Sequence, residues 1–227
     1  MNKKNLTILS LTLAVATVGT FFFKGAKAKS IFPVENKTIA LNPTVEDGYE
    51  VGDEATDFSL KNIDGKMVSL ADFSAAKGFI VVFTCNHCPF SKAYEDRIVA
   101  LDAKYSSKGY PVIAINPNDP AAYEEDSFEN MKKRAAEKGF TYPYLLDEKG
   151  IGQQYGAART PHVFVLKKEG GKNIVKYIGA IDDSAQDPAG VSKKYVESAV
   201  DNLLQDKPVV TKTTKAIGCS IRWRSDS

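Results

Sequence analysis

Apolar and polar residues follow two different periods along the chain, and these periods predict alternating strands and helices. The run from Gly78 to Thr84 is almost wholly apolar and rich in β-branched and aromatic residues, which is typical of a buried strand. From Ser91 to Lys108 the apolar residues recur at helical spacing, and Gly109 is well suited to end that helix. A second buried strand is predicted over 111–116. A strand, a helix and a strand in this order predict a parallel, right-handed unit.

Further elements are predicted on both sides of this unit. An Asp-Gly turn within Asn62 to Gly65 lies between two short alternating runs, so a β-hairpin is expected there. The loop 116–120 lies at the end of a predicted strand, so it is expected either near a ligand site or as a cap of the next helix. The remaining predictions are an amphipathic helix over 128–138, a short apolar segment over 142–146, helical turns over 151–155, an apolar strand opening at Pro161, its partner over 173–178, and a closing helix over 191–204.

The first 28 residues have the pattern of a secretory signal. Lys3 and Lys4 precede a largely apolar stretch from Leu6 to Phe23, and Ala26-Lys27-Ala28 has the small-x-small pattern that precedes cleavage. Removal of residues 1–28 as a signal peptide is expected. An uncleaved membrane anchor is the alternative, since the apolar stretch is near the lower limit for crossing a bilayer. Export, to a bacterial periplasm, would place the cysteines where disulfides persist.

Length and composition predict one domain with extensions. The 227 residues, 43% of them hydrophobic, suffice for one sizeable core. Residues 29–50 are expected to form an extended arm, residues 51–206 the domain and residues 207–227 a C-terminal tail. A net charge of +2 with scattered lysines indicates a solvated surface and argues against nucleic acid as a partner.

Cys85 and Cys88 lie at the predicted strand-to-helix turn, and this position has chemical consequences. Free N–H groups and the positive end of the helix dipole favour an anion there, and the anion of a cysteine is the nucleophilic thiolate. Two cysteines separated by two residues can also close a disulfide. The pair is therefore interpreted as a reversible redox couple.

A structural zinc site is an alternative for such a pair, but it needs further ligands. The chain offers only Cys219, His87 and His162 for this purpose, so redox chemistry is favoured. With three cysteines in the chain, one thiol has no obligatory partner. Cys219 is expected to be an inert thiol in a packed tail, and a third redox role in contact with Cys88 is the alternative.

These features together resemble the thioredoxin superfamily. The Cys-x-x-Cys pair is followed much later by Thr160-Pro161 at the start of a strand, and then by a hairpin and a helix. Residues 83–89, together with the Gly-Cys-x-Ile-x-Trp tail, are most similar to the peroxiredoxin-like redoxins, which are related to the alkyl hydroperoxide reductase and thiol-specific antioxidant family. The resemblance implies an α/β thioredoxin-like fold, with a central mixed sheet flanked by helices, an N-terminal β-hairpin and a C-terminal tail.

The resemblance implies dithiol–disulfide exchange with protein substrates and a protein electron donor, without an organic cofactor. In this interpretation Cys85 attacks, Cys88 resolves the mixed disulfide, and Pro161 is a cis-proline facing the pair. His87 is similar to the histidine of strongly oxidising periplasmic disulfide oxidases, and it would stabilise the thiolate. A solvent-exposed turn residue is the alternative for His87.

A peroxiredoxin-like thiol peroxidase is the second interpretation. Cys88 then occupies the position of the peroxidatic cysteine, hydroperoxides are the substrates, and Pro89 follows as in that family. The family's Thr or Ser three residues earlier is Cys85 here, and Thr84 lies one residue away from that position. Arg159 lies near the place of the family's activating arginine, and a salt bridge in a loop is its simpler role.

A copper-binding metallochaperone of the redoxin fold is the third interpretation. Cys85, Cys88 and either His87 or His162 offer the soft and imidazole ligands that suit copper. The copper-delivery proteins of this fold space their cysteines as Cys-x-x-x-Cys, which this chain does not. A partly covered strand residue is the alternative for His162.

Overall fold

The computed structural model describes residues 48–224. The expected signal peptide, residues 1–28, lies outside the described residues, as does nearly all of the expected arm over 29–50. Among the described residues, no helix combines the length and the apolar character needed to cross a membrane.

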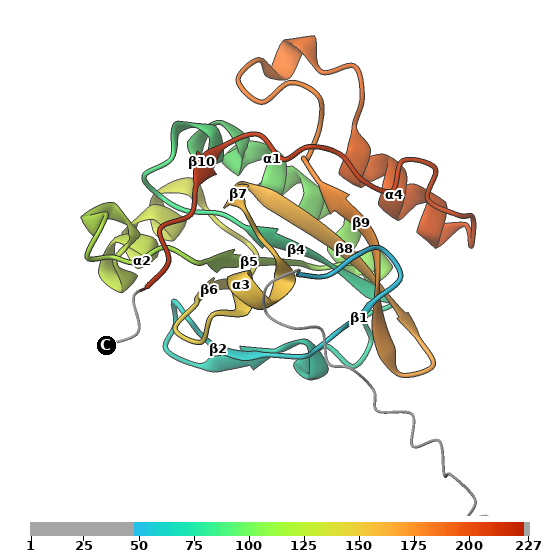
Figure 1. The fold of residues 1–227 in the computed structure, drawn as a ribbon, viewed down its shortest axis with the longest axis horizontal. Coiled ribbons are helices and arrows are strands. Elements are labelled where there is room, and N and C mark those ends of the chain that lie inside the picture. Colours follow the sequence, from blue (N-terminus) through green and yellow to red (C-terminus); the bar gives the residue numbers. More distant parts are fainter. Residues whose placement is uncertain (1–47, 225–227) are drawn as a thin grey trace, which may run out of the picture. The chain divides into compact units, whose positions relative to one another are not determined.

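An eight-stranded sheet runs through the described part of the chain (Figure 1). Its strands in spatial order are β1 (Glu54–Ala55), β9 (Lys172–Gly179), β8 (His162–Glu169), β4 (Gly78–Phe83), β5 (Val112–Asn116), β6 (Tyr144–Leu146), β2 (Ser59–Asn62) and β3 (Met67–Ser69). Strand β5 is parallel to both β4 and β6, whereas the other neighbours are antiparallel. The sheet is therefore mixed, as expected, and β2 and β3 form the expected hairpin.

All four expected helices are present, two with the expected bounds and two with shifted starts. They are α1 (Pro89–Tyr105), α2 (Phe128–Lys138), α3 (Ile151–Tyr155) and α4 (Tyr195–Leu204), with 3-10 turns η1 (Leu70–Asp72), η2 (Ser106–Lys108), η3 (Glu124–Asp126) and η4 (Pro188–Gly190). Helix α1 begins earlier than expected because proline suits the first helical position, where no N–H is needed. Helix α4 begins later than expected because the N–H groups of Ser192 and Lys193 donate to the Asp183 carboxylate instead of joining a helix.

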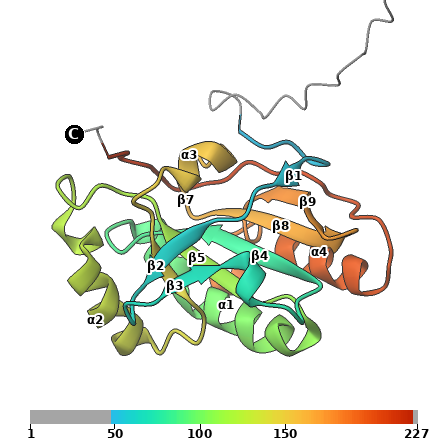
Figure 2. The ribbon, with the colours of Figure 1, turned by 90° about the horizontal axis from the view of Figure 1, so that it is seen from below.

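Two hydrophobic cores lie on opposite faces of the sheet (Figure 2). Side chains of successive strand residues point to opposite faces, so a strand covered on both sides is apolar throughout. In β4, Ile80 and Val82 belong to the core shared with α1, α2 and α4. Phe79, Val81 and Phe83 belong to the other core, which includes residues of α3. This double burial fixes the end of β4, from which the cysteine turn starts.

The C-terminal tail packs on the same unit. Beyond α4 it runs back across the molecule, and Thr213 forms a bridge with Ile178 of β9 (Figure 1). A further short strand, β10 (Cys219–Ser220), pairs antiparallel with β7 (Arg159–Thr160) in a separate two-stranded sheet. Ile221 then enters the core on the α3 face. The tail therefore lies beside β7, directly before Pro161.

Candidate active site

Cys85 and Cys88 lie at the turn between β4 and α1, as the sequence predicts. The N–H of Thr84 donates to the Ile115 carbonyl at 2.9 Å, which continues the strand pairing up to the first cysteine. Cys88 has an extended backbone and is the N-cap residue of α1. Cys85 and Cys88 are 2% and 0% exposed, so both residues are shielded from water.

Thr160 touches both sulfurs. Its Oγ1 lies 3.1 Å from Cys85 Sγ, and Cys88, when protonated, donates to its carbonyl oxygen at 3.3 Å. The Thr160–Pro161 peptide bond is cis, as the sequence predicts. The sequence interpretation missed Thr160, although its place directly before Pro161 was the signal that could have found it.

The surroundings of Cys88 favour its thiolate. The pKa of Cys88 is lowered to about 4, first because Cys85 donates its S–H to the Cys88 sulfur. The thiol and N–H of Cys219 and the N–H of Ser91 also donate to it, and together these donors outweigh the opposing effect of burial. These donors favour the ionised form of Cys88, as expected for a cysteine at a helix start.

The surroundings of Cys85 favour its thiol. Burial raises the pKa of Cys85 above its ordinary value, and the hydrogen bond to Cys88 and the negative charge of Asp126 act in the same direction. Ser91 Oγ, itself fully buried, lies 3.7 Å from Cys85 Sγ. Cys85 is therefore a proton donor towards Cys88 in the reduced protein.

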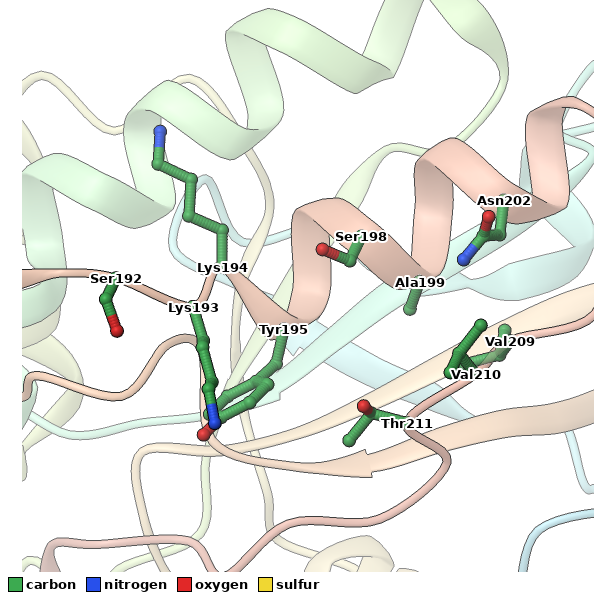
Figure 3. A pocket seen from close by; sticks show the side chains of 10 residues that line it. All are labelled: Ser192, Lys193, Lys194, Tyr195, Ser198, Ala199, Asn202, Val209, Val210 and Thr211. Carbon is green, nitrogen blue, oxygen red and sulfur yellow. The ribbon is translucent and has the colours of Figure 1, made fainter.

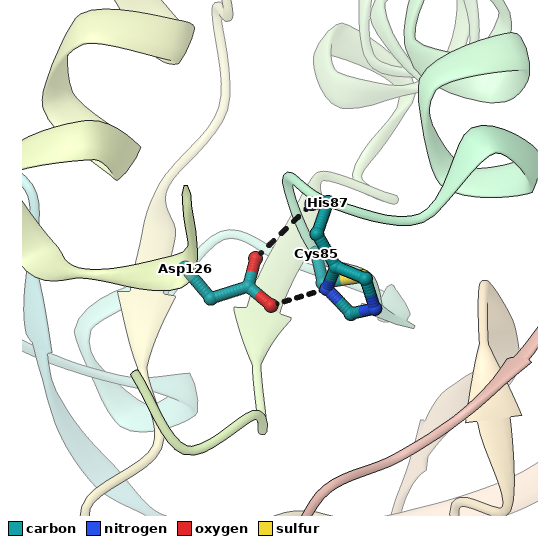
Figure 4. A group of neighbouring side chains, drawn as sticks. All are labelled: Cys85, His87 and Asp126. Carbon is teal, nitrogen blue, oxygen red and sulfur yellow. Dashed lines mark hydrogen bonds and ion pairs between the residues drawn. The ribbon is translucent and has the colours of Figure 1, made fainter. Parts of the chain in front are cut away.

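Asp126 organises the other side of the turn (Figure 4). Its buried carboxylate accepts the Asn86 N–H at 2.6 Å and the Asn118 amide at 3.0 Å, and it lies 2.5 Å from His87 Nδ1. The His87 ring stacks on Tyr123, with 3.7 Å between ring centroids. His87 is thus fixed by Asp126 and is not a solvent-exposed turn residue, and the loop 116–120 lies near the cysteine turn as expected.

The sequence interpretation did not single out Asp126. Asp126 is the last residue of the acidic run Glu124-Glu125-Asp126, and such a run is typical of a solvated surface segment. Only the 3-10 turn η3 places the third of these carboxylates in the interior. No signal in the sequence separates it from its two neighbours.

Ligand atoms of Cys85, His87 and Asp126 lie within 4.8 Å of one another, which is a spacing that a metal ion could use. The bonds just described already occupy His87 Nδ1 and both oxygens of Asp126. Among the described residues, neither Cys85, Cys88 and His162 nor Cys85, Cys88 and His87 form such a group. The donor set fits a hydrogen-bond network better than a metal centre.

The other predicted site residues lie around the turn. Thr84 is buried, and none of the hydrogen bonds of the described residues joins its hydroxyl to a sulfur. Arg159 is exposed and donates to Ser220 Oγ at 3.1 Å. His162 is buried, its Nδ1 accepts the Ala158 N–H at 3.2 Å, and burial lowers its pKa to about 4. His162 is therefore neutral at physiological pH.

Cys219 lies next to Cys88. In the β7–β10 pair it stands opposite Thr160, the residue that both other cysteines contact. Burial and the hydrogen bond to the Cys88 thiolate raise the pKa of Cys219 to about 12, and Cys219 remains half-buried. The structure thus brings all three cysteines to one place.

A separate pocket of about 390 Å³ lies between α4 and the segment 209–211 (Figure 3). Its side chains include Lys193, Tyr195 and Asn202. None of its lining residues belongs to the cysteine turn. This pocket is therefore separate from the candidate active site.

The fold and the cysteine turn define a thioredoxin-like redoxin. Residues 51–177 match the AhpC/TSA family, which is more than half of the chain. The chain belongs to this family, and the expected membership among the redoxins of the thioredoxin superfamily is confirmed.

Two relatives carry names from thiol chemistry. The chain is 29% identical over 125 residues to the thioredoxin-like protein YneN of Bacillus subtilis, across 55% of this chain and 70% of that protein. It is 28% identical over 131 residues to the thiol-disulfide oxidoreductase ResA of Bacillus thuringiensis, across 56% and 69%. The family and these relatives confirm the expectation of an enzyme, a thiol–disulfide oxidoreductase.

Solved structures confirm the fold. A conserved protein from Geobacillus kaustophilus, described as uncharacterized, superposes with a TM-score of 0.73 at 38% identity, over 80% of this chain and 96% of that one. A structure assigned as the thiol:disulfide interchange protein DsbE from Chlorobium tepidum has a TM-score of 0.55 at 23% identity, over 69% and 99%. The second likeness supports the thioredoxin-like fold alone.

Proposed function

We propose that the chain catalyses dithiol–disulfide exchange with other proteins through Cys85 and Cys88, and that Cys88 is the attacking thiolate. The observation that carries this proposal is the position of Cys88 as the N-cap of α1, where the donors around its sulfur lower its pKa. The thiolate is the nucleophilic form of cysteine. Cys85, whose pKa is raised, is poorly suited to the first attack.

These roles are the reverse of those expected from the sequence. That expectation placed both cysteines in the first turn of the helix and made Cys85 the attacking thiolate. Helix α1 instead begins at Pro89, so Cys88 is the N-cap and Cys85 lies before the helix. The N–H of Ser91 therefore points at the second cysteine of the pair.

The exchange then runs in two steps. The Cys88 thiolate attacks one sulfur of a substrate disulfide, forms a mixed disulfide and expels the other sulfur as a thiolate. Cys85 next loses its proton and attacks Cys88 Sγ, which releases the second substrate thiolate and leaves a Cys85–Cys88 disulfide. Two electrons pass from the cysteine pair to the substrate, and a protein dithiol returns them in the next cycle.

We assign His87 and Asp126 to the second step. Cys85, His87 and Asp126 lie together, and Asp126 fixes the imidazole at 2.5 Å. The imidazole can accept the proton that Cys85 must lose and pass it to the departing thiolate. Thr160, through Oγ1 at 3.1 Å, holds the Cys85 sulfur in place for attack.

Export to a bacterial periplasm is part of the proposal, and it rests on the signal pattern of residues 1–28. In that compartment disulfides persist, so protein disulfides and dithiols are available as partners. A fusion of residues 1–28 to a reporter enzyme that is active only after export tests this point. Reporter activity supports export, and a reporter retained in the cytoplasm contradicts it.

Peroxide reduction by Cys88 is the second candidate function. The match to the AhpC/TSA family and the lowered pKa of Cys88 favour it. Cys85 stands where peroxiredoxins carry a Thr or Ser hydroxyl, and this departure argues against it. Hydroperoxides are therefore a candidate substrate besides protein disulfides.

Separate Cys85→Ala and Cys88→Ala variants test the proposal in two assays, reduction of insulin disulfides and consumption of hydrogen peroxide. We expect Cys88→Ala to abolish insulin reduction and to form no mixed disulfide. Cys85→Ala should still attack insulin through Cys88, and the mixed disulfide on Cys88 should persist when Cys219 is also replaced by Ala. A mixed disulfide on Cys85 in the Cys88→Ala variant would overturn the assigned roles. Peroxide turnover that requires Cys88, without insulin reduction, would favour the second candidate.

A further inference from the structure

Close backbone approach holds Cys219 beside Cys88. In the β7–β10 pair Cys219 stands opposite Thr160, whose carbonyl oxygen is 3.3 Å from Cys88 Sγ. Directly before Cys219, Gly218 comes so near to this strand that an added Cβ would lie 2.0 Å from the Thr160 carbonyl oxygen. Only glycine fits there without displacement of the tail.

Polar contacts fasten the tail on both sides of β10. Arg159 donates to Ser220 Oγ at 3.1 Å. Arg222 donates its N–H to Asn118 Oδ1 at 2.8 Å and accepts the Asp119 N–H at 2.7 Å. Asn118 also donates to Asp126, so the tail is tied to the same network that fixes the cysteine turn. The position of Cys219 is therefore built into the fold.

We propose that Cys219 is a second resolving cysteine, which attacks Cys88 and closes a disulfide between the tail and the start of α1. The inference rests on the proposed thiol–disulfide exchange at Cys88, and it adds a residue to that reaction. It also replaces the expectation that Cys219 is an inert thiol.

The step balances without an added oxidant. When Cys85 and Cys88 form a disulfide, the Cys219 thiolate attacks Cys88 Sγ, a Cys88–Cys219 bond forms, and Cys85 leaves as a thiolate. That thiolate takes up the proton that Cys219 has lost. On a mixed disulfide of Cys88 the same attack expels the substrate thiolate instead.

Oxidation of Cys88 prepares Cys219 for this attack. In the reduced protein the neighbouring Cys88 thiolate helps to raise the pKa of Cys219, and the positive charge of Arg159 lowers it. Once Cys88 is in a disulfide its negative charge is gone, so the pKa of Cys219 falls. Cys85 keeps the burial and the Asp126 charge that raise its own pKa. Cys219 is also the most exposed of the three, so a Cys88–Cys219 disulfide is the easier one for a protein reductant to reach.

Peptide mapping distinguishes the two disulfides in the full chain. Trypsin leaves Cys85 and Cys88 in one peptide, residues 78–92, and Cys219 in another, residues 216–222. The reduced protein is treated with oxidised glutathione, quenched in acid, alkylated and digested. We expect the two peptides to be linked through Cys88 and Cys219 in the wild type, and more completely in Cys85→Ala.

The lifetime of the mixed disulfide between glutathione and Cys88 measures the rate at which Cys219 attacks Cys88. We expect it to be at least about tenfold longer in Cys85→Ala/Cys219→Ala than in Cys85→Ala, because the double variant has no resolving thiol. Equal lifetimes in the two variants, with no linked peptides, would overturn the inference. In that case a Cys85–Cys88 disulfide with intact insulin reduction would leave the proposed function standing.

Gly218→Ala separates position from chemistry. This variant keeps all three thiols, but the added Cβ pushes the tail from Thr160, so the linked peptides should be lost. Ile217→Ala, at the exposed position directly before Gly218, is the matched control, and it should keep them. A circular dichroism spectrum and a urea unfolding midpoint equal to those of the wild type show that the variant is folded. Linked peptides at the wild-type yield in Gly218→Ala would contradict the role of strand pairing.

Discussion

The two sides of the cysteine turn are held by different kinds of interaction. On one side, the buried Asp126 carboxylate gathers side chains and N–H groups of the turn and of the loop 116–120. On the other side, the two-residue strands β7 and β10 bring Thr160 and Cys219 to the sulfurs. A buried carboxylate with several donors is costly to disrupt, whereas a pair of two-residue strands contributes few hydrogen bonds. The difference indicates that the Asp126 side of the turn is held more firmly than the β7–β10 side.

The largest effect is expected from Asp126→Asn, which tests the Asp126 side. We expect the free energy of unfolding to fall by about 3 kcal/mol, because buried donors lose a charged acceptor. The pKa of Cys85 should fall as well, since the Asp126 charge helps to raise it. Urea unfolding measures the first effect and thiolate absorbance the second.

Glu125→Gln, at the exposed neighbouring position, is the control for Asp126→Asn. It should change the free energy of unfolding by no more than about 0.5 kcal/mol, as surface substitutions usually do. Equal stability of the two variants would show that the Asp126 network is not what fixes the turn.

His162 tests the other side through pH. Burial lowers its pKa to about 4 from an ordinary value of 6.5, so in that interval the unfolded chain binds a proton that the folded chain does not. Stability should therefore fall as the pH drops from 6.5 to 4, by up to about 3 kcal/mol. In His162→Gln, which can still accept the Ala158 N–H, this loss should be absent. Urea unfolding at pH 7 and pH 4 measures it, and identical pH dependence in both proteins would contradict the assignment.

The titration of Cys88 compares the donors from the two other cysteines. Cys85 is the largest cause of its lowered pKa, and Cys219 contributes less. Cys85→Ala should therefore raise the pKa of Cys88 by about 1–2 units, each worth about 1.4 kcal/mol, and Cys219→Ala should raise it less. Thiolate absorbance followed against pH measures both shifts. The reverse order would make Cys219 the principal partner of Cys88 in the reduced protein.

The smallest effect is expected at Tyr123. Its ring stacks on His87 with an interplanar angle of 10°. Tyr123→Leu should lower the free energy of unfolding by about 1 kcal/mol through loss of this stacking. Tyr123→Phe keeps the ring and should remain close to the wild type in urea unfolding. If the Phe variant loses as much as the Leu variant, the hydroxyl and not the stacked ring is responsible.

The sequence predicts the scaffold of the site well, because β4 and α1 are long enough for their periods to be recognised. It favours Cys85 as the attacking cysteine, whereas we propose Cys88 for that role. The start of a helix is uncertain by about two residues from pattern alone, and here the start at Pro89 decides which sulfur is the N-cap.

The hydrophobic periodicity of the sequence does not predict contacts that short segments make. Strand β10 has two residues and exists only because β7 offers it a partner. Asp126 is buried by the packing of η3 against the turn, and nothing in the run Glu124-Glu125-Asp126 marks the last residue as interior. Both features depend on residues distant in the sequence, so they could be found only in the folded chain.

The docked C-terminal tail also contains an intrinsic fluorescence probe. Trp223 is the only tryptophan in the chain, and it follows Cys219 closely. Its ring lies beside Gly152 and Pro117. The approach to Gly152 is so close that an added Cβ there would lie 2.9 Å from the ring. The emission of this indole should therefore report, without any label, whether the tail is docked.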